Sequence, residues 1–124
     1  MEQVDSNAVL LDSNYVIDIL NGAISPDEFI SCQCVISAVT IMELYAFAGM
    51  SPGEERQIYE AMKQLFIAPV DALIAKRAGV LARTRKRGRA DLIIAATALE
   101  LNIPLLTKNT RDFKNIPSLR LLNA

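Results

Sequence analysis

Residues 9–12 read Val9-Leu10-Leu11-Asp12, a short apolar run that ends on a carboxylate. An unbroken apolar run of this kind is typical of a parallel strand that is buried on both faces. Apolar residues then recur with helical spacing from Tyr15 to Leu20, and Asn21-Gly22 ends that pattern. The stretch therefore predicts a buried strand followed at once by a helix, with Asp12 at the junction.

The same alternation of strands and helices continues through the chain. Further strands are expected at Cys34–Val39, Ile103–Thr107 and Ser118–Leu122, and Ile67–Val70 is either a small strand or an extended link. Further helices are expected from Ser25, at Thr40–Ala48, from Ser51 to about Phe66, from Asp71 to Lys86 or Arg87, and at Ala90–Leu101. This alternation predicts an α/β fold with a parallel sheet and helices on both of its faces.

Local signals mark several helix boundaries. Ser25-Pro26-Asp27-Glu28 and Ser51-Pro52-Gly53-Glu54 are capping-box patterns with proline at the first helical position. Asp71 is predicted to be an N-cap, and Gly88 the C-terminal stop of the helix that begins there. Ala90–Leu101 is apolar nearly all round, so we expect a central buried helix.

The length and composition indicate one domain. The 124 residues fall in the commonest domain size, so a single domain is expected over residues 1–124. Hydrophobic residues make up 52% of the chain, which is enough for a core without disulfides or structural metals. The formal net charge of −1 excludes a globally basic nucleic-acid binder but leaves room for a local basic patch.

The chain contains no histidine. This excludes a Ser-His-Asp triad and an imidazole metal site, so any catalysis must use carboxylates. Cys32 and Cys34, the only cysteines, are poorly placed for a disulfide and cannot complete a zinc site, so we expect reduced thiols that suit a cytosol. No basic-then-apolar leader begins the sequence, and no apolar run approaches the ~20 residues that span a bilayer. We therefore expect a soluble, cytoplasmic protein that makes no use of a membrane.

Four acidic residues fall where a predicted strand ends or a helix begins: Asp12, Glu43, Asp91 and Asp112. Thr107 and Asn109 accompany Asp112 at the end of a later strand. In open α/β sheets, ligands bind outside the carboxyl ends of the strands, so we expect these side chains to meet at one edge. Converging carboxylates usually hold hard cations such as Mg²⁺ or Mn²⁺.

Each of these residues also has an ordinary explanation. Asp12 fits a helix N-cap, and Asp91 fits a helix start favoured by the macrodipole. Glu43 fits a surface acid that is partnered or that extends its carboxylate into solvent. Turn chemistry explains the other three, Thr107, Asn109 and Asp112.

Four stretches, in this order, resemble the PIN-domain nucleases and specifically the VapC-type toxins. They are Leu10-Leu11-Asp12-Ser13-Asn14, Ile36-Ser37-Ala38-Val39-Thr40-Ile41-Met42-Glu43-Leu44, Arg89-Ala90-Asp91-Leu92-Ile93-Ile94-Ala95-Ala96-Thr97-Ala98 and Leu105-Leu106-Thr107-Lys108-Asn109-Thr110-Arg111-Asp112-Phe113. Each motif alone is weak. All four in order, in a chain of this length, make a specific match that runs from end to end.

The resemblance implies a three-layer α/β/α sandwich around a mainly parallel sheet, and an endoribonuclease that depends on Mg²⁺ or Mn²⁺. By matching position, Asp12, Glu43 and Asp91 would be the metal-site acids, and Asp112, the acid nearest to the fourth position, is a candidate catalytic acid. Many relatives carry an acid two residues after the threonine, where this chain has Asn109. Either the site uses three carboxylates with amide and hydroxyl help, or Asp112 substitutes for the missing acid.

The chemistry of phosphodiester cleavage suggests roles for these residues, and the resemblance implies partners. We expect Asp12 and Asp91 to bind the main ion, and Glu43 to bind a second ion or to orient water. Thr107 and Asn109 would position water or phosphate. RNA would be the substrate, the protein would be a homodimer, and the tail of an antitoxin protein would occupy the active-site groove.

A basic segment precedes Asp91 and consists of Arg83, Arg85, Lys86, Arg87 and Arg89. One interpretation is a solvated helix end whose cations complement the helix dipole. The other is a positively charged surface that binds RNA phosphates, and the nearness of Asp91 favours this interpretation. No aromatic pattern typical of an RNA-recognition motif accompanies the segment, so no base-reading platform of that kind is expected.

Three other kinds of protein share some of these features. Asn109 keeps open a PIN-like domain that binds RNA or a protein partner without cutting. A phospho-receiver domain also uses a parallel sheet, Mg²⁺ and a threonine, but Lys108 directly follows Thr107 and no acidic pair stands at Asp12. A haloacid-dehalogenase-type phosphatase needs a second acid two residues after Asp12, where Asn14 stands.

Overall fold

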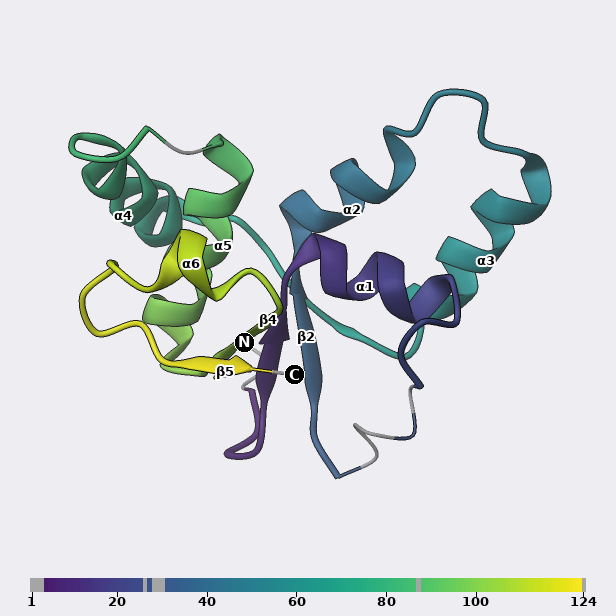
Figure 1. The fold of residues 1–124 in the computed structure, drawn as a ribbon, viewed down its shortest axis with the longest axis horizontal. Helices are drawn as coiled ribbons and strands as arrows, with labels where there is room; N and C mark the ends of the chain where they lie inside the picture. The colour runs from purple at the N-terminus through teal and green to yellow at the C-terminus, as the bar shows by residue number, and fades with distance from the viewer. Residues whose placement is uncertain (1–3, 26, 28–30, 87, 124) are drawn as a thin grey trace.

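The protein is described by a computed structural model that covers residues 4–25, 27, 31–86 and 88–123. Five strands form one sheet: β1 (Val9–Leu11), β2 (Cys34–Ser37), β3 (Phe66–Ala68), β4 (Leu105–Thr107) and β5 (Leu121–Asn123). Their order across the sheet is β3-β2-β1-β4-β5, and every neighbouring pair is parallel (Figure 1). The predicted α/β class with a parallel sheet is confirmed.

Six helices connect and cover these strands. They are α1 (Ser13–Leu20), α2 (Ala38–Tyr45), α3 (Pro52–Met62), α4 (Ala72–Ala82), α5 (Arg89–Leu101) and α6 (Thr110–Phe113). Figure 1 shows α1, α2 and α3 on one side of the sheet and α4 and α5 on the other. The three-layer α/β/α arrangement implied by the family resemblance is thus the observed one.

Two hydrophobic cores result from the alternation of side chains along the strands. Leu10, Val35 and Leu105 face a core shared with α4 and α5. Leu11 and Ile36 face the second core, which α1, α2 and α3 complete. The central strands are therefore buried on both faces, as their unbroken apolar sequences predict.

The boundary between β2 and α2 differs from the predicted one. The strand ends at Ser37 and the helix begins at Ala38, whereas a strand to Val39 and a helix from Thr40 were expected. Ser37 has extended backbone, and its Oγ accepts a hydrogen bond of 3.1 Å from the Val39 N–H. This N-cap ends the strand early, because the capping hydroxyl satisfies a backbone donor that has no partner in the helix.

The segment between α4 and α5 was also predicted wrongly. Helix α4 ends at Ala82 instead of Lys86 or Arg87, and Gly88 is the N-cap of α5 and not the stop of α4. The Arg85 guanidinium donates to the carbonyl of Asn115 at 3.0 Å and to that of Leu81 at 3.5 Å. This long-range contact ties the segment to the chain after α6, and Thr84, the first residue of the segment, has poor intrinsic helix propensity.

Several predicted boundaries are confirmed. The Ser51 capping box is present with both of its hydrogen bonds, and the bond from the Ser51 backbone lowers the pKa of the Glu54 carboxyl. Asp71 caps α4 through a 2.9 Å bond from the Ile74 N–H. Asn102 ends α5 in the left-handed conformation, with φ of 55°.

Other expectations need correction. Helix α3 ends at Met62, four residues before the expected Phe66, which instead begins strand β3. Helix α6 was expected to be a loop, and the helix expected from Ser25 lies mostly outside the described residues. Cys32 and Cys34 are free thiols, as predicted, and burial together with the nearby Cys32 raises the pKa of the Cys34 thiol.

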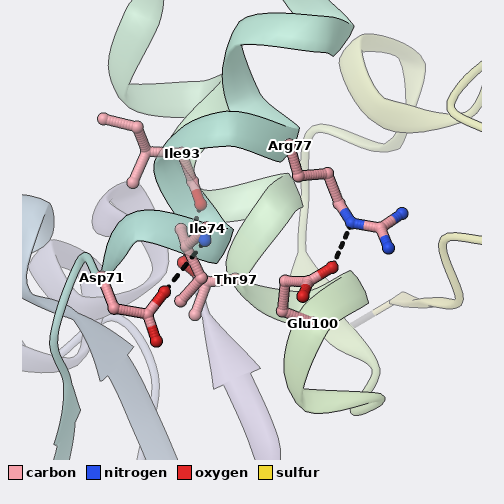
Figure 2. Close-up of polar contacts among 6 residues, drawn as sticks. All are labelled: Asp71, Ile74, Arg77, Ile93, Thr97 and Glu100. Carbon is pink, nitrogen blue, oxygen red and sulfur yellow. Dashed lines mark hydrogen bonds and ion pairs between the residues drawn. The ribbon is translucent and has the colours of Figure 1, made fainter.

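Helices α4 and α5 pack closely as a pair, and polar contacts support this packing (Figure 2). The Arg77 Nε donates to the Glu100 carboxylate across the two helices. Inside α5, the Thr97 hydroxyl is fully buried and donates to the Ile93 carbonyl at 2.7 Å. None of the helices in the described part of the chain has the length and apolar character that crossing a membrane requires.

Candidate functional site

The strand order places a topological switch point between β1 and β4. From β1 the chain proceeds through β2 to β3 on one side, and it later returns to β4 on the other side of β1. In sheets of this kind, ligands bind at the carboxyl ends of the two strands that flank the switch point. Asp12 directly follows β1 and Thr107 is the last residue of β4, so both lie at that position.

Asp12 is buried, with 5% of its surface exposed, and both of its carboxylate oxygens accept hydrogen bonds. Oδ1 accepts from the Tyr15 N–H at 2.8 Å, which makes Asp12 the N-cap of α1. Oδ2 accepts from the Thr107 hydroxyl at 2.5 Å. The capping explanation is therefore correct, but it accounts for only one of the two oxygens.

Thr107 is fully buried, and its hydroxyl has a defined direction. Its Oγ1 accepts a 2.9 Å bond from the Asn109 N–H and gives its own hydrogen to Asp12. The side chain amide of Asn109 in turn donates to the carboxylate of Asp112, in α6. A hydrogen-bonded series thus joins Asp12, Thr107, Asn109 and Asp112 along the carboxyl ends of β1 and β4.

Glu43 reaches the same region from α2. Glu43 was expected in about the first turn of that helix. It lies in the second turn, because α2 begins two residues earlier than expected. The Ser13 hydroxyl donates to Glu43 Oε1, and Ser13 directly follows Asp12. Residues 12 and 13 are adjacent, so the hydrogen bonds of the Asp12 carboxylate and the hydrogen bond that holds Glu43 lie next to each other in the structure.

Asp91 lies in the first turn of α5, half-buried, across the sheet from α1. Helices α2 and α5 contact one another, and α5 also contacts β2. Within residues 4–25, 27, 31–86 and 88–123, no group of three or more Asp, Glu or Cys side chains lies close enough to hold a metal ion. The joint metal site of Asp12, Glu43 and Asp91 thus stays a prediction.

The donor set nevertheless fits a hard divalent cation. It consists of carboxylate and hydroxyl oxygens, which Mg²⁺ and Mn²⁺ prefer over nitrogen or sulfur. Among the described residues, Lys63 forms an ion pair with Glu60, Arg77 with Glu100 and Lys108 with Asp18. In the described part of the chain, neither Asp12 nor Glu43 has such a cationic partner. A carboxylate as buried as Asp12 calls for positive charge nearby, which a bound cation would supply.

The basic segment divides into two kinds of residue. Arg83, Lys86 and Arg89 are exposed, and Arg87 lies outside the described residues. Arg85 is half-buried and holds the α4–α5 connection to the chain after α6. A cavity of about 480 Å³ lies between Arg85, Lys86 and Asp112.

Sequence reasoning missed two residues of this region, Ser13 and Thr40. The hydroxyl oxygens of these side chains lie 2.9 Å apart, and both side chains are buried. Ser13 stands beside Asp12 in the first motif and Thr40 lies three residues before Glu43 in the second. Their positions beside Asp12 and Glu43 could have marked them as site residues, but nothing in the sequence shows that the two hydroxyls are in contact.

One hydrogen bond of this site can be tested directly. Replacing Thr107 by Val removes a buried bond to a carboxylate, so we expect the free energy of unfolding to fall by about 1.5–3 kcal/mol. Thr97→Val is the matched control, since Thr97 is equally buried but donates only to a backbone carbonyl. That variant should lose only about 1 kcal/mol. Urea unfolding of both variants measures the difference, and equal losses would contradict a charged acceptor at Asp12.

The fold and this arrangement define a small α/β/α protein with a buried, hydrogen-bonded carboxylate, Asp12, at the switch point of a parallel sheet. Comparison with known families identifies which class of such proteins it is. The chain belongs to the PIN domain family, whose model matches residues 9–119. This membership overturns the phospho-receiver alternative.

Individual relatives agree with the family. Ribonuclease VapC10 of Mycobacterium tuberculosis is 30% identical over 122 residues, which cover 90% of this chain and 90% of the relative. VapBC-1 from nontypeable Haemophilus influenzae is similar in structure, with a TM-score of 0.81 and 27% identity over 94% of this chain and 97% of that chain. A toxin–antitoxin complex from Klebsiella pneumoniae has a TM-score of 0.76 and 30% identity, covering 92% of this chain and 95% of that chain.

Proposed function

We propose that this protein is a metal-dependent endoribonuclease and the toxin of a toxin–antitoxin pair. Membership of the PIN domain family and the similarity to ribonuclease VapC10 support the reaction class. The observation that carries the proposal is Asp12, a buried carboxylate at the switch point whose orientation Thr107 fixes. Such a carboxylate is suited to hold a hard cation against an RNA phosphate.

Asp12, Glu43 and Asp91 would hold Mg²⁺ or Mn²⁺. When bound, such an ion lowers the pKa of a coordinated water and offsets negative charge on the phosphoryl oxygens. Asp112 would act as the further acid, held in place by the amide of Asn109. The buried Thr107 hydroxyl would keep Asp12 in one orientation, so the position of the carboxylate is set before RNA arrives.

RNA binding would use the basic segment beside this site. The exposed cations Arg83, Lys86 and Arg89 are available to phosphates, whereas the guanidinium of Arg85 is already bound to backbone carbonyls. Lys86 also lines the cavity that contains Asp112. Phosphates bound there would lie close to Asp112. This arrangement favours a role in placing the RNA substrate over the alternative, a helix end that is merely solvated.

We further propose a cytoplasmic protein that binds an antitoxin and forms a homodimer. The similarity to VapBC-1 and to the Klebsiella pneumoniae toxin–antitoxin complex supports the antitoxin. A groove of about 490 Å³ between α1, α2 and α3 would receive its tail, since Glu43 lines the groove. Phe47 also lines the groove and is 69% exposed, so it offers apolar surface to a partner.

Incubation with RNA tests the reaction. A pool of tRNA, rRNA and mRNA should be cleaved with Mg²⁺ or Mn²⁺ present, and cleavage should stop when a chelator is added, because the ion activates water. Readdition of Mn²⁺ in excess over the chelator should restore it.

Asp91→Asn is the active-site control in this experiment, and it should cleave far more slowly under every condition. Cleavage that survives the chelator would contradict metal dependence. RNA that binds but stays intact with both metals would favour the PIN-like binding domain that Asn109 keeps open.

A further inference from the structure

The hydroxyls of Ser13 and Thr40 form a contact between α1 and α2, two helices that lie side by side on the same face of the sheet (Figure 1). Thr40 is fully buried and Ser13 is 8% exposed. Two polar side chains with so little access to water must satisfy each other or a third group. The third group is Glu43, which accepts a hydrogen bond from Ser13.

The direction of these bonds follows from the number of hydrogens available. An ionised carboxylate can only accept, and a serine hydroxyl has one hydrogen to give. Because Ser13 gives that hydrogen to Glu43, the 2.9 Å contact with Thr40 requires Thr40 to be the donor. Hydrogen bonds therefore run in one direction, from Thr40 to Ser13 to Glu43.

The series resembles the one on Asp12. There the Asn109 N–H donates to Thr107, and Thr107 donates to the Asp12 carboxylate. Each of the two carboxylates is thus held by a buried hydroxyl that is itself held by a second donor. Ser13 and Asp12 are adjacent in the chain, so the two series meet at one point of the backbone.

We propose that Ser13 is a positioning residue, which together with Thr40 fixes the Glu43 carboxylate in the orientation that a metal ion or its bound water requires. This inference rests on the proposed function. Glu43 is a long side chain on a helix surface, and holding it in one rotamer costs conformational entropy. The buried hydroxyls place that carboxylate before the cation binds, so the affinity for the cation is higher.

Calorimetric titration with Mn²⁺ tests the role of Ser13 without depending on cleavage. Ser13→Ala should weaken Mn²⁺ binding about 10- to 100-fold, the usual effect of removing a group that hydrogen-bonds to a metal ligand. Ser13→Thr keeps the hydroxyl and should keep the affinity. Thr40→Val leaves Ser13 in place but removes the hydroxyl that donates to it, so it should weaken Mn²⁺ binding by less than Ser13→Ala does. If Ser13→Ala does not fold, Thr40→Val tests the same hydrogen-bonded series.

Ser37→Ala is the matched control. Ser37 is a buried serine at the start of the helix that carries Glu43, but its hydroxyl caps Val39 and does not contact Glu43. This variant should lose thermal stability and keep Mn²⁺ affinity. RNA cleavage by Ser13→Ala should also recover at high Mn²⁺ concentration, which a purely structural defect would not allow.

The outcomes separate this inference from the proposed function. Wild-type Mn²⁺ affinity in Ser13→Ala, with weakened affinity in Glu43→Gln, would overturn the positioning role and leave the nuclease proposal intact. Wild-type affinity in Glu43→Gln would also overturn the positioning role, since the carboxylate would then not hold the ion, whereas the nuclease proposal fails separately if Asp12→Asn binds Mn²⁺ as tightly as the wild type.

Discussion

Asp12→Asn is expected to fold and to lose more than about 100-fold of the RNA cleavage rate. Asparagine is as good an N-cap as aspartate, so its Oδ1 can still accept from the Tyr15 N–H and α1 keeps its start. The negative charge is lost, and with it a ligand of the proposed cation. Removing a group that merely supports a metal ligand costs 10- to 100-fold, so removing the ligand itself should cost at least the upper end of that range.

Asp18→Asn is the control for this change. Asp18 is on the same helix, but it is partly exposed and pairs with Lys108 at 3.2 Å. It should cleave RNA at the wild-type rate. Initial rates of cleavage at saturating Mn²⁺, with circular dichroism to confirm folding, measure the comparison. Equal rates for Asp12→Asn and the wild type would remove Asp12 from the mechanism.

Leu10→Ala is expected to lower the free energy of unfolding by about 2–5 kcal/mol. Leu10 is fully buried in the central strand β1, where it pairs with β2 on one side and β4 on the other. Its truncation leaves a cavity that flanking strands cannot close without losing their pairing. Because domains of this kind are stable by only about 5–15 kcal/mol, the loss is a large part of the total.

The exposed Leu73 on α4 provides the matched control, with 66% of its surface in solvent. Leu73→Ala should change stability by no more than about 0.5 kcal/mol. Urea unfolding curves of the two variants give both values. A loss below about 1 kcal/mol in Leu10→Ala would mean that β1 is not the centre of the core.

The sequence predicted those parts of the fold whose causes are local. The apolar run before Asp12, the capping box at Ser51, the N-cap at Asp71 and the end of α5 at Leu101 all depend on neighbours within a few residues. The end of β2 was missed because Ser37 is compatible with both a strand and an N-cap, and the choice depends on where the strand stops pairing. Short polar residues at such junctions are ambiguous for this reason.

The parts that could not be predicted depend on contacts between distant residues. Arg85 lies outside α4, and its guanidinium binds the carbonyl of Asn115, thirty residues further along the chain. The candidate site shows the same limit. Thr107 could be placed at a strand end from the sequence, but its bond to Asp12 crosses 95 positions and its direction depends on Asn109.

The most direct test of the site is an anomalous difference map from crystals grown with Mn²⁺. We expect a peak at the carboxyl ends of β1 and β4, with the carboxylates of Asp12 and Asp91 as its ligands and Glu43 at the ion or at its water. A map with no peak at that position, or with the three carboxylates on separate surfaces, would contradict this expectation.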